Sequence, residues 1–203
     1  MSENLETQYK QNNKSQTSFK EKLQIFIKEF FIPLVIALAI IIPIRVFVAQ
    51  PFFVQGASME PNFHAWDYLI VDIFTYKFLH DPQRGDVVII VPPVNKDTYY
   101  IKRIIGLPNE TIEMRQGKVI IRNKEYPAGF ELKEPYIDPK NMSANNFVYK
   151  LGPDEYFVMG DNRAHSSDSR AFGAIKRDAI KARAFLRLFP FDKIDYLPAN
   201  FKY

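Results

Sequence analysis

The chain changes from polar to apolar within its first 50 residues. Residues 1–20 are rich in Asn, Gln, Ser, Lys and Glu, and such a segment buries too little apolar surface to offset its ordering entropy, so we expect it to be mobile. We place the end of this tail at residue 24. From Phe30 to Ile44 no residue is charged, and as a helix this run would span about 22 Å, short of the roughly 30 Å of a bilayer core. If Arg45 snorkels toward the headgroups, Val46–Ala49 extend the run to the required length. We therefore predict a transmembrane anchor over residues 25–49.

An apolar run of this length also fits a buried core helix or a cleaved secretory signal. The basic residues argue against a core helix, because five lysines precede the run, whereas Arg45 is the only Lys or Arg between it and Lys77. This asymmetry obeys the positive-inside rule and predicts a cytoplasmic N-terminus and an extracytoplasmic remainder at the inner membrane. A cleaved signal needs small residues at positions −3 and −1, and the best candidate, Phe47-Val-Ala49, has a bulky Phe at −3. We therefore predict an uncleaved, single-pass anchor.

Beyond residue 50 the pattern becomes one of short apolar runs separated by Gly, Pro, Asn or Asp. Runs rich in Val, Ile, Tyr and Phe with such punctuation are typical of β-strands joined by turns. The strand-like runs are Tyr68–Phe74, Asp86–Val91, Tyr99–Ile105, Lys118–Arg122, Phe147–Leu151, Tyr156–Met159 and Ala182–Leu188. We predict a mainly β fold, in which the transmembrane helix is followed by an antiparallel, barrel-like sheet domain over residues 50–203, with a small inserted β module at about 106–154.

The composition narrows the possible chemistry. The 203-residue chain has no cysteine, which excludes disulfides, thiolate catalysis and Cys-ligated metals. The net charge is +4, but Lys and Arg are scattered and never form a run of five or six, so we predict no nucleic-acid partner. His64 and His80 have no paired ligands at metal spacing. We accordingly predict neither a metal nor another cofactor.

Two short segments carry candidate catalytic groups. In Gly56-Ala-Ser58-Met-Glu-Pro61 a serine lies between a flexible glycine and a rigid proline, and a sharp turn of this kind can expose a hydroxyl and aim amide N–H groups at an oxyanion. In Tyr100-Ile-Lys102-Arg103 the period of a strand places Lys102 on one face with Tyr100 and Ile104. An ammonium group in such surroundings loses hydration, so its pKa falls and the neutral amine can accept a proton from a serine. Most serines and lysines in such positions are structural, so neither segment is decisive alone.

Two further segments are dense in polar groups. Arg84-Gly-Asp86 is a turn that opens a buried strand, and a structural role suits it. The segment Gly160-Asp-Asn-Arg163-Ala-His-Ser166-Ser-Asp168-Ser-Arg170 places many hydrogen-bonding side chains between two strands. Such a density predicts either an exposed loop or a satisfied polar network.

Together these segments resemble the bacterial type I signal peptidase family of Ser-Lys serine proteases. Their order agrees with that family: an anchor, Ser-Met-x-Pro, an Arg-Gly-Asp strand, Tyr-Ile-Lys-Arg-x-x-Gly-Leu-Pro, then Gly-Asp-Asn-Arg-x-x-Ser-x-Asp-Ser-Arg. The resemblance runs from about Ile44 to Leu188. It implies a membrane-bound serine endopeptidase that removes N-terminal signal peptides, cleaving after small residues of the A-x-A type. We expect a monomer whose partners are exported preproteins and the lipid bilayer.

The resemblance also implies roles for individual residues. Ser58 would be the nucleophile, with its backbone N–H donating to the oxyanion, and Lys102 the general base. Ser166 would orient the lysine amine through a hydrogen bond. Gly56 stands where some members carry a serine that supplies a second oxyanion donor, so this donor is missing or supplied otherwise. Asn62 stands where Thr is usual, and we interpret it as peripheral. The geometry of the site would be held by Asp161, Arg163, Asp168, Arg170 and Arg103.

A signal peptide is expected to bind in an extended conformation along strand edges near Phe53–Gly56 and Tyr99–Lys102. Bulky apolar walls leave room for Ala at position −1 and exclude larger side chains by overlap. By position, the residues of this pocket would be Val54, Gly56, Met59, Phe63, Tyr100 and Ile101. An aromatic cluster is interpreted either as core or as a contact with the bilayer surface, and it comprises Phe52, Phe53, Phe63 and Trp66.

Three alternatives compete with the Ser58–Lys102 hypothesis. His165, close to Asp168, suggests a Ser-His-Asp triad. A self-cleaving repressor-type peptidase resembles signal peptidases in dyad and fold, but Ala128-Gly129, the only Ala-Gly bond, lies downstream of both dyad residues, and no helix-turn-helix precedes them. A non-catalytic, membrane-tethered β module would be indicated by loss of the serine or the lysine, and both are present.

Overall fold

The computed structural model describes residues 19–43, 45, 49–201 and 203. Most of the predicted tail, and four residues near the end of the predicted anchor, lie outside these described residues. The chain forms two compact units, which divide between Val46 and Phe47.

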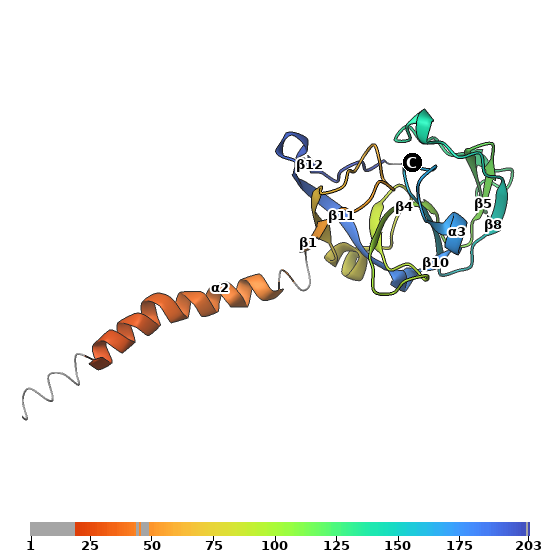
Figure 1. Cartoon of the computed structure of the whole chain (residues 1–203). Coiled ribbons are helices and arrows are strands. Elements are labelled where there is room, and N and C mark those ends of the chain that lie inside the picture. The colour runs from red at the N-terminus through yellow and green to blue at the C-terminus, as the bar shows by residue number, and fades with distance from the viewer. Residues whose placement is uncertain (1–18, 44, 46–48, 202) are drawn as a thin grey trace, which may run out of the picture. The chain divides into compact units, whose positions relative to one another are not determined.

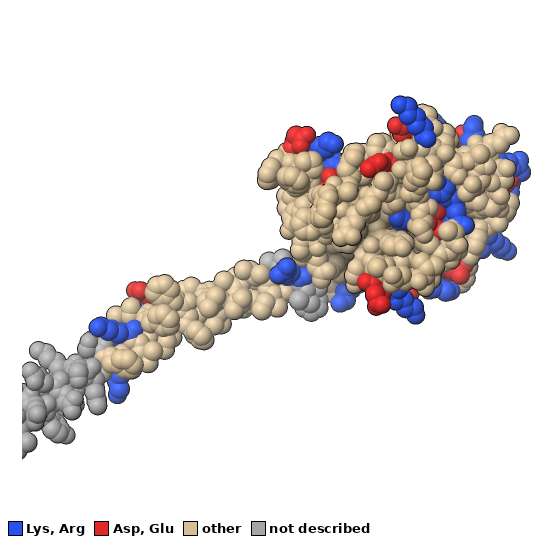
Figure 2. All heavy atoms as spheres, viewed as in Figure 1, with Lys and Arg blue, Asp and Glu red and all other residues tan. Residues whose placement is uncertain are grey.

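The first unit contains a helix from Phe19 to Pro43, which includes the π-helical turn η1 (Ile27–Phe31) and the α-helix α2 (Ile32–Pro43) (Figure 1). Figure 2 shows a continuous uncharged stretch along this helix. The helix is long and apolar enough to cross a membrane, and none of its most apolar stretch is buried against protein. It begins earlier than the predicted anchor, and Ala49, expected at the end of the anchor, instead begins a strand.

The second unit is built on a large, curled antiparallel sheet. Its strand order is β1-β2-β11-β3-β4-β9-β10, and β12 pairs with β11. The strands are β1 (Ala49–Phe53), β2 (Tyr68–Asp72), β3 (Val87–Ile90), β4 (Tyr100–Gly106), β9 (Glu155–Met159), β10 (Ile175–Lys176), β11 (Ile180–Phe189) and β12 (Asp195–Tyr196). This sheet confirms the prediction of a mainly β, antiparallel fold after an apolar helix.

A smaller antiparallel sheet lies between β4 and β9 in sequence, with strand order β7-β6-β5-β8. Its strands are β5 (Thr111–Arg115), β6 (Lys118–Arg122), β7 (Phe130–Glu131) and β8 (Phe147–Lys150). They fall inside the range in which the sequence predicted an inserted module. Short helical segments complete the fold, namely η3 (Thr75–Leu79), η4 (Pro139–Asn141), α3 (Ser169–Phe172), η5 (Arg177–Ala179) and η6 (Phe191–Lys193).

Strand β4 lies between β3 and β9 in the large sheet and borders three hydrophobic clusters. Ile101 packs in the first with residues of β1, β2 and β3, Ile105 packs in the second with the small sheet, and Ile104 packs in the third. Because every residue from 101 to 106 is buried, any polar side chain on this strand must find its partners inside the protein. Lys102 and Arg103 are in this position.

The predicted strand Tyr68–Phe74 is shorter in the structure because a side chain ends it. Asp72 Oδ1 accepts a hydrogen bond from Thr75 N–H at 3.0 Å, and its Oδ2 accepts one from Thr75 Oγ1 at 2.5 Å. An aspartate in this position satisfies the free N–H groups at the start of a helical turn. The strand therefore ends at Asp72, two residues before the end of the predicted run, and the chain turns into η3.

Candidate active site

The Gly56–Pro61 motif forms a tight turn after β1. Met59 and Phe63 are buried in the core, and the N–H groups of Asn62 and Phe63 both donate to Met59 O at 3.0 Å. Gly56 has a φ of +77°, a left-handed conformation that suits glycine. The core thus holds the turn from one side, while Ser58 is half-buried and faces a cleft.

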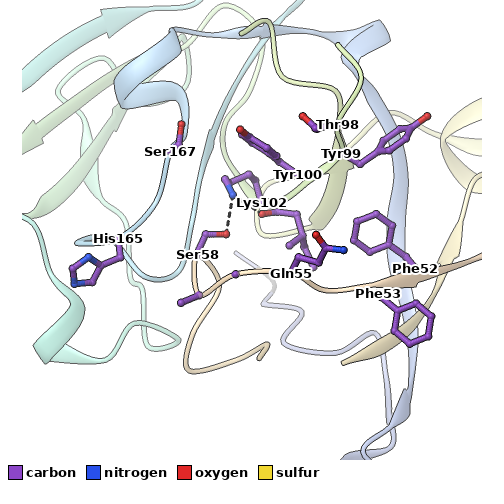
Figure 3. Close-up of a pocket in the computed structure, with 13 residues that line it drawn as sticks. Phe52, Phe53, Gln55, Ser58, Thr98, Tyr99, Tyr100, Lys102, His165 and Ser167 are labelled. Atoms are coloured by element: carbon purple, nitrogen blue, oxygen red, sulfur yellow. Dashed lines mark hydrogen bonds between the residues drawn. The ribbon is translucent and has the colours of Figure 1, made fainter. Parts of the chain in front are cut away.

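Lys102 lies on β4 opposite this turn, and only 3% of its surface is exposed. Its Nζ is hydrogen-bonded to Ser58 Oγ at 2.9 Å and donates to Ile101 O at 2.8 Å (Figure 3). The centroid of the Tyr100 ring lies 5.1 Å from the same nitrogen. The structure therefore brings together the serine and the lysine that the sequence singled out.

Burial lowers the pKa of Lys102 from 10.5 to about 8, because the ammonium group loses its hydration. The negative charges of Asp168 and Asp161 act against this effect, and the positive charge of Arg170 adds to it. Near neutral pH a useful fraction of Lys102 is therefore a neutral amine, which can accept a proton.

Asp168 lies in the polar segment that begins at Gly160, and its charge acts on Lys102. It accepts hydrogen bonds from Arg170 Nε and Nη2, both at 2.8 Å, and from Gly160 N–H at 3.0 Å. Burial alone would raise the pKa of Asp168, but Arg170 and the Gly160 N–H hold the pKa below its ordinary value. Asp168 therefore stays a fixed negative charge beside the lysine.

The other charged residues of this loop are also paired and buried. Asp161 accepts hydrogen bonds from Arg103 Nε at 2.7 Å and Nη2 at 2.6 Å. Arg163 forms a salt bridge with Glu134, a residue that the sequence did not single out. Removing one partner of a buried pair leaves an uncompensated charge, which typically costs about 3–5 kcal/mol. The five residues expected to hold the geometry thus belong to three buried ion pairs next to the Ser58 turn.

Ser166 does not make the hydrogen bond to Lys102 that the resemblance implied. Its Oγ is buried with no hydrogen-bond partner among the described residues. It lies against Gly160, where an added Cβ would stand 2.3 Å from this oxygen. It is close enough to Asp168 to help lower the pKa of that carboxyl group, although their geometry falls outside that of a hydrogen bond. The Lys102 amine is instead directed toward the Ile101 carbonyl.

Two asparagines fasten the Ser58 turn. The interpretation of Asn62 as peripheral is wrong, because its Nδ2 donates to Asp161 Oδ2 at 2.8 Å. Asn162 donates through Nδ2 to Ala57 O and through its backbone N–H to Ser58 O, both at 3.1 Å. Asn62 directly follows the Gly56–Pro61 motif, and Asn162 lies inside the polar segment that begins at Gly160. These positions were the only feature of the sequence that could have pointed to a role in the site.

A cleft of about 460 Å³ opens beside the Ser58–Lys102 pair (Figure 3). Aromatic side chains line one side of it, and shorter polar ones lie on the other side of Ser58. The aromatic side includes Phe52, Phe53, Tyr99 and Tyr100, and the polar side includes His165 and Ser167.

Of the six residues expected to wall a pocket for position −1, three line this cleft and three do not. The lining contains Gly56, Tyr100 and Ile101. Val54, Met59 and Phe63 are at most 1% exposed and belong to the core. Of the two interpretations of Phe63, core packing is therefore the one that holds, because its ring packs inside the protein.

Two strand edges border the cleft. β4 pairs with β9 only from Arg103 onward, so Tyr100–Lys102 have a strand partner on the β3 side alone. β1 pairs with β2, and no other strand pairs with it in the described part of the chain. Such half-open edges can accept an extended peptide as an additional strand.

His165 is exposed, and its ring points away from Ser58 (Figure 3). Its backbone N–H is bound by Asn162, and among the described residues no hydrogen bond joins its ring to Ser58 or Asp168. The geometry therefore favours Lys102 over His165 as the partner of the serine.

A family model for signal peptidase, peptidase S26, matches residues 27–189. The chain belongs to this family. A signal peptidase I P of Bacillus subtilis subsp. natto is 35% identical over 165 residues, which are 79% of this chain and 88% of the relative. The signal peptidase I of Bacillus licheniformis is 33% identical over 198 residues, 93% of this chain and 97% of the relative. A crystal structure of a signal peptidase I from Enterococcus faecalis, 30% identical, covers 51% of this chain and 97% of that one, with a TM-score of 0.43.

As a member of the signal peptidase family, the chain is a serine endopeptidase and therefore a hydrolase. Its apolar helix before the sheet domain is consistent with a single-pass membrane protein.

Proposed function

We propose that the chain is a membrane-bound signal peptidase I in which Ser58 is the nucleophile and Lys102 the general base. The observation that carries the proposal is the 2.9 Å hydrogen bond between Ser58 Oγ and Lys102 Nζ, in surroundings that lower the pKa of the lysine to about 8.

The geometry suits a two-step acyl transfer. Ser58 Oγ attacks the scissile carbonyl carbon while its proton passes to the neutral Lys102 amine. The C–N bond then breaks, the protonated lysine gives its proton to the leaving amine, and the signal peptide stays as an ester on Ser58. Water attacks the ester carbon and gives a proton to the neutral Lys102 amine, the bond between that carbon and Ser58 Oγ breaks, and the protonated lysine returns the proton to Oγ. This releases the signal peptide as its carboxylic acid and regenerates both the serine and the neutral lysine.

The backbone of the nucleophile turn supports an oxyanion site. Asn162 binds the carbonyl oxygens of Ala57 and Ser58, which fixes the orientation of these two peptide groups. Among the described residues the Ser58 N–H meets no acceptor, so it remains available to a developing oxyanion. Gly56 offers no side-chain donor, so the backbone N–H carries this role.

The two sides of the cleft suit the two parts of a preprotein, the signal peptide and the mature segment. The apolar core of the signal peptide and its small −3 and −1 residues precede the scissile bond. The aromatic side, with Phe52 and Tyr99, suits this part, and its bulky walls leave room for Ala in an A-x-A pattern. The polar side, with His165 and Ser167, suits the mature segment, whose sequence varies. The side chains proposed to contact −1 are Gly56, Tyr100 and Ile101.

The lysine asymmetry supports a topology with residues 1–24 in the cytoplasm and the sheet domain outside it. Exposed aromatic side chains near the start of that domain, Phe53 and Trp66, suit a lipid contact. In spheroplasts, protease added outside should digest the sheet domain. Full protection with an intact membrane would contradict this orientation.

Cleavage of a purified exported precursor by the detergent-solubilised protein tests the function. We expect cleavage by the wild type, loss of cleavage in Ser58→Ala and Lys102→Ala, and normal cleavage in Lys118→Ala, whose lysine is exposed on the small sheet. An active Ser58→Ala protein would refute the proposed nucleophile.

A further inference from the structure

Arg103, next to Lys102 on β4, is fully buried, and all three nitrogens of its guanidinium donate hydrogen bonds. Two of its nitrogens hold the Asp161 carboxylate. Its Nη1 donates to Gly85 O at 2.8 Å and to Ala199 O at 2.7 Å. The ring of Tyr136 lies against the guanidinium, with 3.9 Å between its centroid and the guanidinium carbon. An aromatic ring in this position stabilises a desolvated guanidinium through the negative face of its π system.

Tyr136 comes from the small β module, between β7 and β8, and it is bound through both its hydroxyl and its backbone carbonyl. Its hydroxyl donates to Glu134 Oε1 at 2.9 Å and lies 2.7 Å from Tyr203 OH. Its carbonyl accepts a hydrogen bond from Asn62 Nδ2 at 2.8 Å. Burial raises the pKa of Tyr136, so the phenol stays protonated and remains a donor.

Asn62 connects this tyrosine to the nucleophile. Its Nδ2 bridges Tyr136 O and Asp161 Oδ2, and its own N–H closes the turn by donating to Met59 O. A shift of Tyr136 would therefore move one support of the turn that begins at Ser58.

Phe201, near the end of the sequence, packs against both Gly85 and Tyr136. An added Cβ on Gly85 would lie 2.0 Å from the Phe201 carbonyl oxygen, so the backbone of this segment lies directly on the Arg-Gly-Asp turn. The Phe201 ring packs edge-on against Tyr136 at 5.9 Å. Figure 1 shows this end of the chain between the two sheets.

We propose that Tyr136 is a positioning residue for the Ser58–Lys102 pair, acting through Asn62 and Arg103 and held in place by Glu134 and Tyr203. This inference rests on the proposed function. It gives the small module a role in catalysis, because one of its loops reaches the supports of both reacting side chains.

The electrostatic consequence has a definite sign. The charged groups that face Lys102 are Asp168 and Arg170, which pair with each other, and Asp161, which Arg103 binds. If the stacked ring is lost and Arg103 loosens, more of the Asp161 charge acts on Lys102. The pKa of the lysine then rises, and the neutral fraction falls at neutral pH.

The test compares Tyr136→Leu, Tyr136→Phe and Tyr126→Phe with the wild type, each as full-length protein in detergent. The Phe variant keeps the ring on Arg103 but loses the hydroxyl contacts. Tyr126 is an exposed tyrosine of the same module and serves as the matched control. The measurements are kcat, KM and the apparent pKa of the pH–rate profile on a precursor, well below each melting temperature.

We expect Tyr136→Leu to lower kcat about tenfold with KM changed by less than about twofold, and to raise the apparent pKa by about half a unit. Tyr136→Phe should recover part of this loss, with kcat about threefold below the wild type, and Tyr126→Phe should match the wild type. A folded Tyr136→Leu protein with normal kcat and apparent pKa would refute the inference, even if its melting temperature fell.

If Tyr136→Leu does not fold, Tyr136→Phe decides, and a wild-type kcat in that variant would refute the inference. Failure of the proposed function looks different, because the wild type would then leave the precursor uncut or Ser58→Ala would cut it.

Discussion

The titration of Lys102 gives the sharpest quantitative prediction, with pH as the perturbation. With a pKa of about 8, roughly 1% of the lysine is neutral at pH 6, about 10% at pH 7 and about 90% at pH 9. If the neutral amine is the base, kcat/KM should rise about 90-fold from pH 6 to pH 9 and then level off. A lysine with the unperturbed value of 10.5 would be only about 3% neutral at pH 9, and the rate would continue to climb.

The assay is cleavage of a purified precursor at substrate concentrations far below KM, so that the rate reports the free enzyme. Lys118→Ala is the control, because its exposed side chain lies on the small sheet and its loss should leave the profile unchanged. A rate that is flat between pH 6 and 9, or that still rises between pH 9.5 and 10.5, would refute the assignment of a desolvated Lys102 as base.

Three further predictions concern the same site. Lys102→Arg should be inactive, because a guanidinium stays protonated, whereas His165→Ala should still cleave; the opposite pair of results in a cleavage assay would favour a triad. Lys102→Met should be inactive but more stable than the wild type. In the wild type the pKa of Lys102 is lower in the folded than in the unfolded state, so the protonated lysine destabilises the folded protein by about 3 kcal/mol below pH 8. This penalty disappears as pH rises toward 10.5, and methionine does not carry it. Thermal unfolding at pH 7 should thus show a higher melting temperature, less so at pH 10, and a decrease at pH 7 would contradict this. With Ala, Ser, Val and Phe at −1 of a precursor, cleavage should be efficient after Ala, weaker after Ser, and lost after Val and Phe; efficient cleavage after Phe would refute the pocket.

Much of the fold follows from periodicity and composition. The runs that became β2, β3, β4, β6, β8, β9 and β11 have the expected β-branched and aromatic content. β1 was missed because Ala49 lies next to an apolar run, and local composition does not show where a helix ends and a strand begins. The short strands β7, β10 and β12 were missed because two residues carry no period.

The site shows a similar division. Ser58 and Lys102 were predicted from motifs, and the structure places them within hydrogen-bonding distance. The core positions of Met59 and Phe63 were not predicted, because the irregular backbone of a turn gives no period from which to tell a pocket wall from a core residue.

Glu134, Tyr136 and Tyr203 could not have been found from the sequence at all. Their importance arises from contacts with residues far away in the chain, such as Arg103 and Arg163. No local pattern encodes such contacts, since they depend on how the small sheet packs against the large one.

Ser58 is proposed to form a covalent acyl-enzyme with the signal peptide, and trapping that intermediate tests the mechanism without relying on variants alone. A precursor is mixed with the wild-type protein and quenched in acid within the first turnover, and the digested enzyme is then analysed by mass spectrometry. We predict that the peptide containing Ser58 gains the mass of the signal peptide less one water, and that Ser58→Ala shows no adduct. An adduct on another residue, or cleavage without any covalent intermediate, would contradict the proposed mechanism.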